Sequence, residues 1–123
     1  MQHLFLGQKG EDTAPAYLEK KGYKIRERNF SRRPFGEIDI VAEKQGKIIF
    51  IEVKTIKEQD DFLAEDELSP KKYLCLLKMA EIYLSAKKLP QETACQIDII
   101  ALTKKENGKY RLRHYKNAVE DNL

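Results

Sequence analysis

The chain has 123 residues, of which 41% are hydrophobic and 35% are charged, and its formal net charge is +3. This length suits one domain with one core and is too short for two ordinary domains. No apolar run is long enough to span a membrane or to form the centre of a signal peptide, so we expect a cytoplasmic protein without a membrane partner. Cys75 and Cys95 fit reduced thiols of the core better than a disulfide framework or a zinc site.

The first predicted helix covers residues 7–21, with Glu11, Ala14 and Leu18 on one face at helical spacing. Glu11 is explained by its position alone, because the helix dipole favours a negative charge at the N-terminus. Pro15 removes the hydrogen bond to the carbonyl of Glu11, so this helix is expected to kink or to start late. Gly22 is predicted to end it in the left-handed conformation.

Basic residues gather after the first predicted strand, which covers residues 23–29. Arg28, Arg32 and Arg33 are predicted to lie in or beside a loop before the next strand. Bidentate contacts from such arginines would hold phosphate groups. A solvated basic loop explains any single arginine equally well.

The centre of the chain, residues 36–55, is predicted to be two apolar strands joined by a tight turn at residues 45–46. This register places Asp39 opposite Glu52, where the two carboxylates would repel each other. A divalent cation between them would turn that repulsion into a site, and oxygen ligands suit Mg²⁺ or Mn²⁺ better than zinc. Lys54, two residues further on, would stabilise charge on a phosphate or help a water lose its proton.

The same register places Glu37 opposite Lys54, where Glu37 would orient the lysine amine. Because side chains alternate along a strand, we expect Glu37, Asp39, Glu52 and Lys54 to share one face of the hairpin. A surface salt-bridge cluster would explain one of these pairs. It would leave the two carboxylates facing each other without compensation.

Acidic residues are concentrated after this hairpin. Residues 58–67 hold six acids and no base, so the remainder of the chain carries +9. Such an excess is compatible with nucleic-acid binding, although any basic protein would show it. The segment lacks a helix or strand period, and we predict a mobile acidic loop at about residues 57–68 that is a gate, a partner-binding segment or a sign of weakened DNA binding.

Ser69 and Pro70 predict the start of a second helix, with serine as the N-cap and proline at the first helical position. The helix is predicted to end near Lys88, because Pro90 follows. Its Lys71 would reach a phosphate, although a solvated lysine is the simpler interpretation. The apolar face that should cover the sheet contains Leu74, Leu77 and Leu84, with Tyr73, Leu76, Ala80 and Tyr83 alongside.

Two more strands are predicted, over residues 95–102 and 109–116. Asp98 is a carboxylate within the apolar first of these strands, and we favour pairing with a basic group over a role as a third metal ligand. The last strand is predicted to be an edge strand. Its Arg111 and Arg113 would either discourage edge-to-edge pairing or contact nucleic acid.

The order of these elements predicts an α/β domain with a mixed sheet of about five strands flanked by helices, in the order αβββαββ. Residues 1–123 are expected to form this single domain, with a frayed tail at about residues 118–123. The first three strands should form an antiparallel meander, and the fourth should join after a helical crossover.

Several blocks carry a family resemblance. Asp39, twelve intervening residues and Glu52-Val53-Lys54 resemble the D…(D/E)-x-K signature of the PD-(D/E)xK nuclease superfamily. More closely, the chain resembles the YraN family of small nuclease-like proteins, which are related in fold to archaeal Holliday junction resolvases. The match spans roughly residues 7–102. Its blocks are Gly10-Glu11, Gly22-Tyr23, Arg28-Asn29, Gly36-Glu37-Ile38-Asp39, Phe50-Ile51-Glu52-Val53-Lys54 and Ile97-Asp98-Ile99.

The resemblance implies a restriction-endonuclease-like core and a metal-dependent endonuclease that hydrolyses DNA phosphodiester bonds, with structured or branched DNA as its partner. Asp39, Glu52 and the carbonyl of Val53 would hold Mg²⁺ or Mn²⁺, Lys54 would assist the attacking water, and Glu11 would be an outer member of the site. Resolvases of related fold act as dimers, which suggests a homodimer by analogy. The alternative is a non-catalytic nucleic-acid-binding or protein-interaction module with the same fold.

Overall fold

The computed structural model describes residues 2–5, 10–57 and 69–118. The predicted order αβββαββ is confirmed, and one additional short strand precedes the first helix. The elements are β1 (Gln2–Phe5), α1 (Gly10–Lys20), β2 (Lys24–Arg32), β3 (Gly36–Lys44), β4 (Lys47–Lys57), α2 (Pro70–Ala86), β5 (Cys95–Lys104) and β6 (Tyr110–Tyr115).

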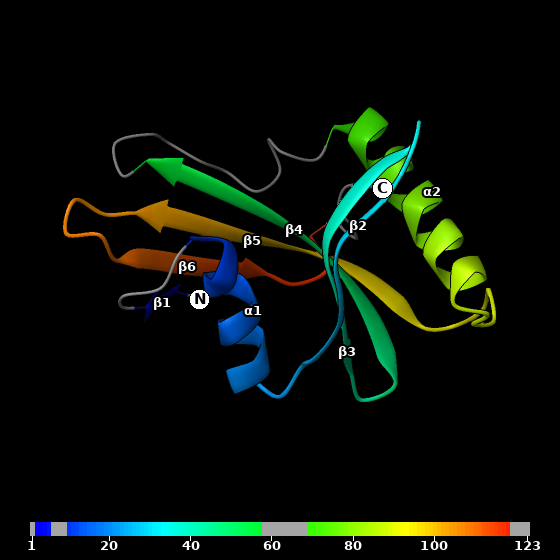
Figure 1. Ribbon diagram of the computed structural model, residues 1–123, viewed down its shortest axis with the longest axis horizontal. Coiled ribbons are helices and arrows are strands. Elements are labelled where there is room, and N and C mark those ends of the chain that lie inside the picture. The colour runs from blue at the N-terminus through cyan, green and yellow to red at the C-terminus, as the bar shows by residue number, and fades with distance from the viewer. Residues whose placement is uncertain (1, 6–9, 58–68, 119–123) are drawn as a thin grey trace.

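The strands form one mixed sheet in the order β1-β6-β5-β4-β3-β2 (Figure 1). As predicted, β2, β3 and β4 form an antiparallel meander, and β5 returns parallel to β4 after α2. The prediction that β6 is an edge strand is wrong, because β1 pairs along its outer side. Arginines in β6 point toward the faces of the sheet, which leaves the backbone groups of β6 available to β1.

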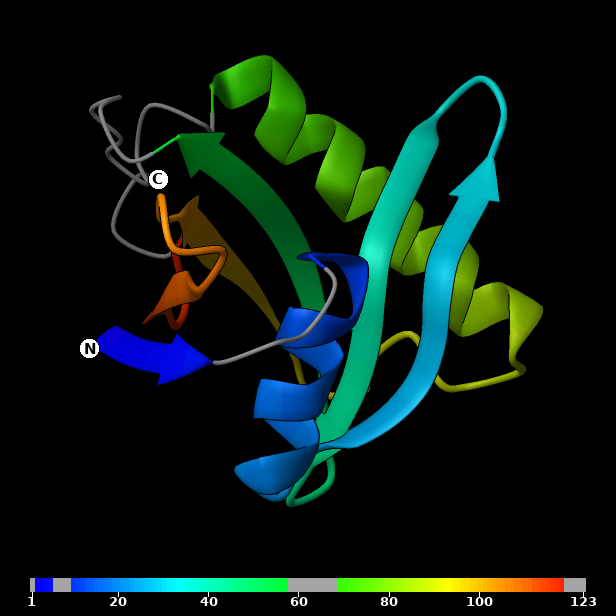
Figure 2. The same ribbon diagram turned by 60° about the vertical axis from the view of Figure 1, so that its left-hand side comes forward.

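The two helices cover opposite faces of the sheet, with α1 in front of β3 and α2 behind it in Figure 2. Each helix packs on its own cluster of buried side chains. The cluster under α2 contains Phe30, Ile38, Val41, Phe50 and Ile99 from the strands. The cluster under α1 contains Ile40, Ala42, Ile51, Ile100 and Leu102.

Helix α2 starts as predicted. The hydroxyl of Ser69 accepts a hydrogen bond from the backbone N–H of Lys72 at 3.2 Å, and Pro70 is the first helical residue. Proline is tolerated there, because the first N–H groups of a helix have no intrahelical acceptor. The helix ends at Ala86, two residues before the predicted end.

The buried face of α2 agrees with the prediction for Leu76, Tyr83 and Leu84 and differs from it for Leu74 and Leu77. Leu76, Met79 and Tyr83 are buried, whereas Leu74 is 66% exposed and Leu77 is 39% exposed. Both sets of residues recur at helical spacing, so the sequence pattern alone does not choose between them. The choice is made by the strands, because the ring of Tyr83 packs edge-on against aromatic rings of β2 and β4.

Both cysteines are free and exposed, so the prediction that they are core thiols is wrong. Ala118 was predicted to begin a frayed tail, but its N–H donates to the carbonyl of Ile97 at 2.9 Å. Residues 119–123 and the acidic segment at residues 58–68 lie outside the described residues. Neither helix in the described part of the chain has the length and apolar character needed to cross a membrane.

Candidate active site

The turn between β3 and β4 has the predicted register, with Lys44 opposite Lys47. Its central residues, Gln45 and Gly46, have φ values of 52° and 76°. Positive values at both positions are the requirement of a type I′ turn, whose twist matches that of the flanking strands. The hairpin is therefore correctly predicted at this end.

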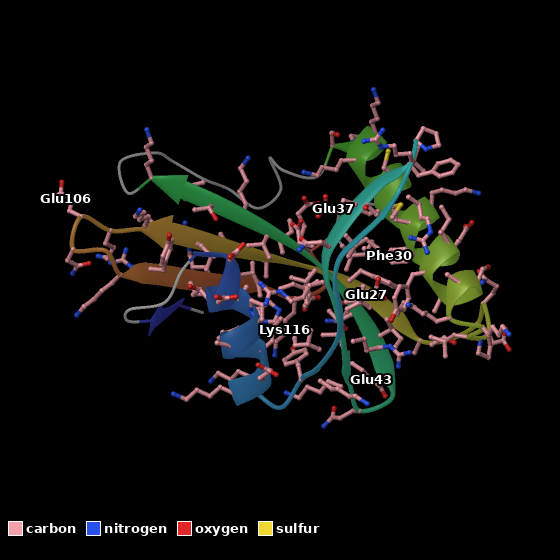
Figure 3. The ribbon with its side chains drawn as sticks, viewed as in Figure 1. Glu27, Phe30, Glu37, Glu43, Glu106 and Lys116 are labelled. Carbon is pink, nitrogen blue, oxygen red and sulfur yellow. The ribbon has the colours of Figure 1, made fainter. Side chains whose placement is uncertain are left out.

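Strands β3 and β4 diverge beyond the part of the hairpin next to the turn. The last described pair of the β3–β4 ladder is Ile40 with Ile51, although β4 continues beside β5 as far as Lys57. Figure 1 shows β3 and β4 diverging from this point, which we call the fork. Two predicted pairs beyond the fork are absent from the described ladder, Asp39–Glu52 and Glu37–Lys54. Glu37 lies on the part of β3 beyond the fork (Figure 3).

A side chain replaces the backbone ladder at the fork. The carboxylate Oδ2 of Asp39 accepts a hydrogen bond from the backbone N–H of Val53 at 2.7 Å. In a continued register this N–H would face the backbone of β3, and a buried N–H must find some acceptor. The side chain of Asp39 thus replaces the backbone carbonyl of β3 as the acceptor for this N–H.

A left-handed residue in β2 accounts for the divergence. Asn29 has a φ of 55° and occupies the gap in the β2–β3 ladder where Asp39 would be its partner. On one side of this gap, Phe30 and Ile38 pack under α2, and on the other side Ile40 packs under α1. The alternation of side chains along β2 and β3 is therefore interrupted at Asn29 and Asp39, and residues on either side of this point face opposite helices. The prediction that Asp39 and Glu52 share one flat face of the hairpin is wrong for this reason.

The fork borders a cavity of about 310 Å³ beneath the start of α1. Its lining includes Asp39 and Val53 from the strands and Glu11 from α1. Gly10 gives close packing here, because an added Cβ atom would lie 2.9 Å from the hydroxyl oxygen of Tyr110, whose side chain would have to shift. The Gly10-Glu11 block thus allows the helix to approach the sheet closely enough for Glu11 to reach this cavity.

Arg28 secures α1 at this cavity. The helix runs unbroken through Pro15, which has no N–H to offer the carbonyl of Glu11. The Nη2 of Arg28 donates to that carbonyl oxygen at 2.6 Å and also lies 3.2 Å from Oδ1 of Asp12. A side chain from β2 therefore donates to the Glu11 carbonyl the hydrogen bond that Pro15 cannot supply. Arg28, a predicted phosphate ligand, is engaged within the protein.

Glu52 faces the other helix. Its side chain is only 18% exposed, and its Oε1 lies 3.3 Å from Nζ of Lys72 in α2. The same lysine acts on Asp39, since burial raises the pKa of Asp39 while the Val53 N–H and the charge of Lys72 partly lower it. One ammonium group thus offsets charge on both carboxylates. The position of Lys72 in the predicted helix did not indicate that it would lie close to these carboxylates.

Lys54 lies on the same face of β4 as Glu52, because β4 pairs regularly with β5 and its side chains alternate. We call Asp39, Glu52, Lys54 and Lys72 the fork cluster. In the paired strands, Lys54 is level with Ala101, and Ala101 is level with Arg113. Arg113 therefore lies on the Lys54 face, about 10 Å away across two strand spacings. Its buried Nε has no hydrogen-bond partner among the described groups.

The remaining predicted phosphate ligands are more dispersed. Arg111 lies on the same face of β6 as Arg113, opposite Thr103. Arg32 belongs to β2 instead of the predicted loop, since the β2–β3 ladder extends to it, and its guanidinium packs 4.5 Å from the centre of the Phe30 ring. Arg33 is exposed in the following turn, and Lys71 is exposed in the first turn of α2.

Asp98 is fully buried. Its Oδ2 lies 2.7 Å from Nε2 of His114, so the predicted pairing with a basic group is confirmed. A carboxylate only accepts, so Nε2 carries the proton, and Nδ1 of a neutral ring then accepts from the hydroxyl of Tyr17 at 2.8 Å. Burial is the main cause that raises the pKa of Tyr17 to about 12, which keeps this hydroxyl protonated.

Asparagine at position 39 is expected to stabilise the fold at neutral pH. Because burial raises the pKa of Asp39, the folded chain resists ionisation, and stability should fall as pH rises from the unfolded to the folded pKa. Asp39→Asn keeps an oxygen for the Val53 N–H without the charge. Its melting temperature should exceed that of the wild type by a few degrees at about pH 7, and the gain should vanish at about pH 3.

Thermal melts followed by circular dichroism at both pH values test this, with Asp12→Asn as the exposed control. A lower melting temperature for Asp39→Asn at neutral pH would show that Lys72 and Val53 outweigh burial. The assigned cause of the pKa shift would then be wrong.

Comparison with known proteins covers most of the chain. The model of the uncharacterised protein family UPF0102 matches residues 10–102, which include the fork cluster. A UPF0102 protein of Bacteroides fragilis is 38% identical over 117 residues, which cover 95% of this chain and 93% of that protein. One from Syntrophomonas wolfei is 40% identical over 115 residues, covering 92% and 96%. One from Chloroflexus aurantiacus is 45% identical over 98 residues, covering 80% and 78%. The chain therefore belongs to the uncharacterised protein family UPF0102, which is YraN-like as the sequence blocks predicted.

Proposed function

We propose that this protein is a metal-dependent endonuclease that hydrolyses DNA phosphodiester bonds at the fork cluster. The observation that carries the proposal is the divergence of β3 and β4 beside two half-buried carboxylates, Asp39 and Glu52. Half-buried carboxylates favour a neighbouring cation, and a phosphate substrate brings further negative charge that a cation would offset.

The oxygen atoms at the fork fit Mg²⁺ or Mn²⁺. Within the described residues, no three His, Cys, Asp or Glu side chains form a group that would enclose a metal ion. Mg²⁺ commonly binds through only one or two carboxylates and takes its other ligands from substrate phosphates and water. Asp39 and Glu52 would supply these carboxylates, and the backbone carbonyl of Val53 would add an oxygen. The bound cation would supply positive charge at the scissile phosphate and acidify the attacking water.

The residues around the cation would divide the remaining work. Lys54 would orient the attacking water and offset the charge that develops on the phosphate. Arg113, which lies on the same face, would hold a neighbouring phosphate of the strand through the terminal amino groups of its guanidinium. Glu11 lines the cavity from the opposite side and would accept a proton or orient a water. Structured or branched DNA and a homodimer remain the implied substrate and assembly, by resemblance to resolvases.

One observation favours the non-catalytic alternative. Lys72 already provides a positive charge close to both carboxylates. A binding module that retains the fold would need no metal if this ion pair were permanent. The two functions therefore differ in what Lys72 does when a divalent cation is offered.

Replacing Lys72 with methionine is expected to increase Mg²⁺ affinity at least fivefold. The substitution removes a competing charge from two carboxylates, and a unit charge about 4 Å away contributes about 1 kcal/mol even in water-like surroundings. Isothermal titration of Mg²⁺ into Lys72→Met and into the neighbouring control Lys71→Met measures the change. An unchanged or weaker affinity in Lys72→Met would mean that the cation does not bind between these carboxylates.

A cleavage assay tests the proposed function. Flapped, four-way and single-stranded DNA are incubated with the protein in Mg²⁺, in Mn²⁺ and in EDTA, together with Asp39→Asn and Glu52→Gln. We expect metal-dependent cleavage by the wild type and a loss of at least 100-fold in both variants. DNA binding without cleavage, unaffected by either substitution, would favour the binding module.

A further inference from the structure

A second cavity lies at the opposite end of α1 from the fork. It measures about 220 Å³ and is bordered by the β3–β4 turn and the start of β5. Three lysines line it, Lys44, Lys47 and Lys116, together with Tyr23 and Gln96. Among the described residues that line it, none is acidic. Val53 is six positions beyond Lys47 along β4, so this lysine pocket is about 20 Å from the fork.

Lys47 is held in place from the floor of the pocket. Its Nζ donates to Oε1 of Gln96 at 3.1 Å, and Nε2 of Gln96 donates to Oδ1 of the buried Asp98 at 2.8 Å. Because a carboxylate only accepts, the amide NH₂ of Gln96 must face Asp98, which turns the amide oxygen toward Lys47. The buried acid thus fixes the lysine through one intermediate side chain.

Lys44 is held from the side. Its Nζ donates to the carbonyl of Lys21 at 2.8 Å and lies 4.6 Å from the centre of the Tyr23 ring. An ammonium group has three donors, so these contacts leave donors on both Lys44 and Lys47 for a ligand. Lys116 follows β6 and adds the third charge. Figure 3 shows it far from Glu106, which occupies the turn at the other end of β6.

We propose that the lysine pocket binds a phosphate group. Three like charges around one cavity repel one another, and an anion seated between them removes that repulsion while accepting their remaining hydrogen bonds. The volume is below the roughly 300–1,000 Å³ of pockets that enclose drug-sized ligands, so the pocket suits a phosphate better than a whole nucleotide. The phosphate belongs either to a small phosphate monoester or to a nucleic-acid backbone. The inference does not depend on cleavage at the fork.

Two-dimensional ¹H–¹⁵N NMR with inorganic phosphate at constant ionic strength tests this directly. We expect saturable shifts of the amides of Gln45 and Gln96, which line the pocket, and of Gly46 in the adjoining turn. The double variant Lys47→Gln/Lys116→Gln should weaken the phosphate affinity at least tenfold. Lys104→Gln removes one charge at the far end of β5 and should leave it unchanged. Thermal melts of each variant confirm that the fold is retained.

Adenosine monophosphate and a single-stranded oligonucleotide distinguish the two sources of phosphate. Tenfold weaker oligonucleotide binding in the double variant supports the backbone, whereas weaker binding of the monophosphate alone supports a small ligand. The same titrations on Asp39→Asn keep the outcome separate from the nuclease proposal. Shifts that do not saturate, or equal losses in Lys104→Gln and the double variant, would overturn the phosphate pocket.

Discussion

Replacing Lys54 with methionine should lower the rate of metal-dependent DNA cleavage by about 10²- to 10³-fold while leaving Mg²⁺ binding intact. Lys54 is two residues beyond Glu52 on the same face of β4, and the metal ligands proposed at the fork do not include it. Its amine would act on the attacking water and on charge that develops only in the transition state. The substitution removes that interaction and retains most of the side-chain volume.

Lys57→Met is the matched control, since it removes the same charge three residues along the same strand. Lys57 is exposed, and alternation points its side chain to the other face of the sheet. Single-turnover cleavage at saturating Mg²⁺ compares the two variants. Equal cleavage rates in Lys54→Met and Lys57→Met would show that Lys54 has no catalytic role, regardless of the Mg²⁺ affinity of the two variants.

Replacing Asp98 with alanine should lower the free energy of unfolding by about 3–5 kcal/mol. This carboxylate is fully buried and accepts from the Gln96 amide, the His114 ring and the backbone N–H of Asn117. Its removal leaves the buried His114 ring and two part-buried donors without this acceptor, and each lost hydrogen bond costs free energy. Urea unfolding followed by circular dichroism measures the loss.

Asp98→Asn keeps one acceptor oxygen and should lose less than Asp98→Ala, which makes the prediction testable even if the alanine variant fails to fold. Asp12→Ala serves as the control for an exposed pair, because Asp12 lies 3.2 Å from Arg28 at the surface. Exposed pairs of this kind contribute about 0–1 kcal/mol. A loss in Asp98→Ala no larger than that in Asp12→Ala would contradict the role of the buried network.

Local chemistry made much of the fold predictable. The β3–β4 turn follows from Gln45-Gly46 flanked by apolar strands, and the start of α2 follows from Ser69-Pro70. The parallel return of β5 follows from a helix placed between two apolar strands. Each of these features depends on residues close together in the sequence, which is why the pattern was sufficient.

The arrangement of the candidate site was less accessible. The prediction that Asp39 and Glu52 share one face assumed unbroken alternation, whereas Asn29 adopts a left-handed conformation and the strands exchange faces. A local signal was available in the identity of residue 29. Asparagine is among the residues that tolerate this conformation best.

The contacts that α2 makes with the sheet could not be predicted from any local sequence pattern. Leu74 and Leu77 have the same spacing as the residues that are buried, so only packing against Phe30 and Phe50 decides which face of α2 turns inward. The same packing brings Lys72 to Glu52. The edge strand β1 was missed for a related reason, because four residues paired to a distant strand carry little periodicity of their own.

The most direct test of the account is a calorimetric titration of Mg²⁺ and Mn²⁺ into the wild type, Asp39→Asn, Glu52→Gln and the exposed control Asp12→Asn. The account predicts one saturable site in the wild type and in the control, with loss of that site in both fork variants. Equal metal affinity in all four proteins would contradict a divalent cation held by Asp39 and Glu52. The same conclusion would follow if the wild type bound no metal, either alone or with DNA.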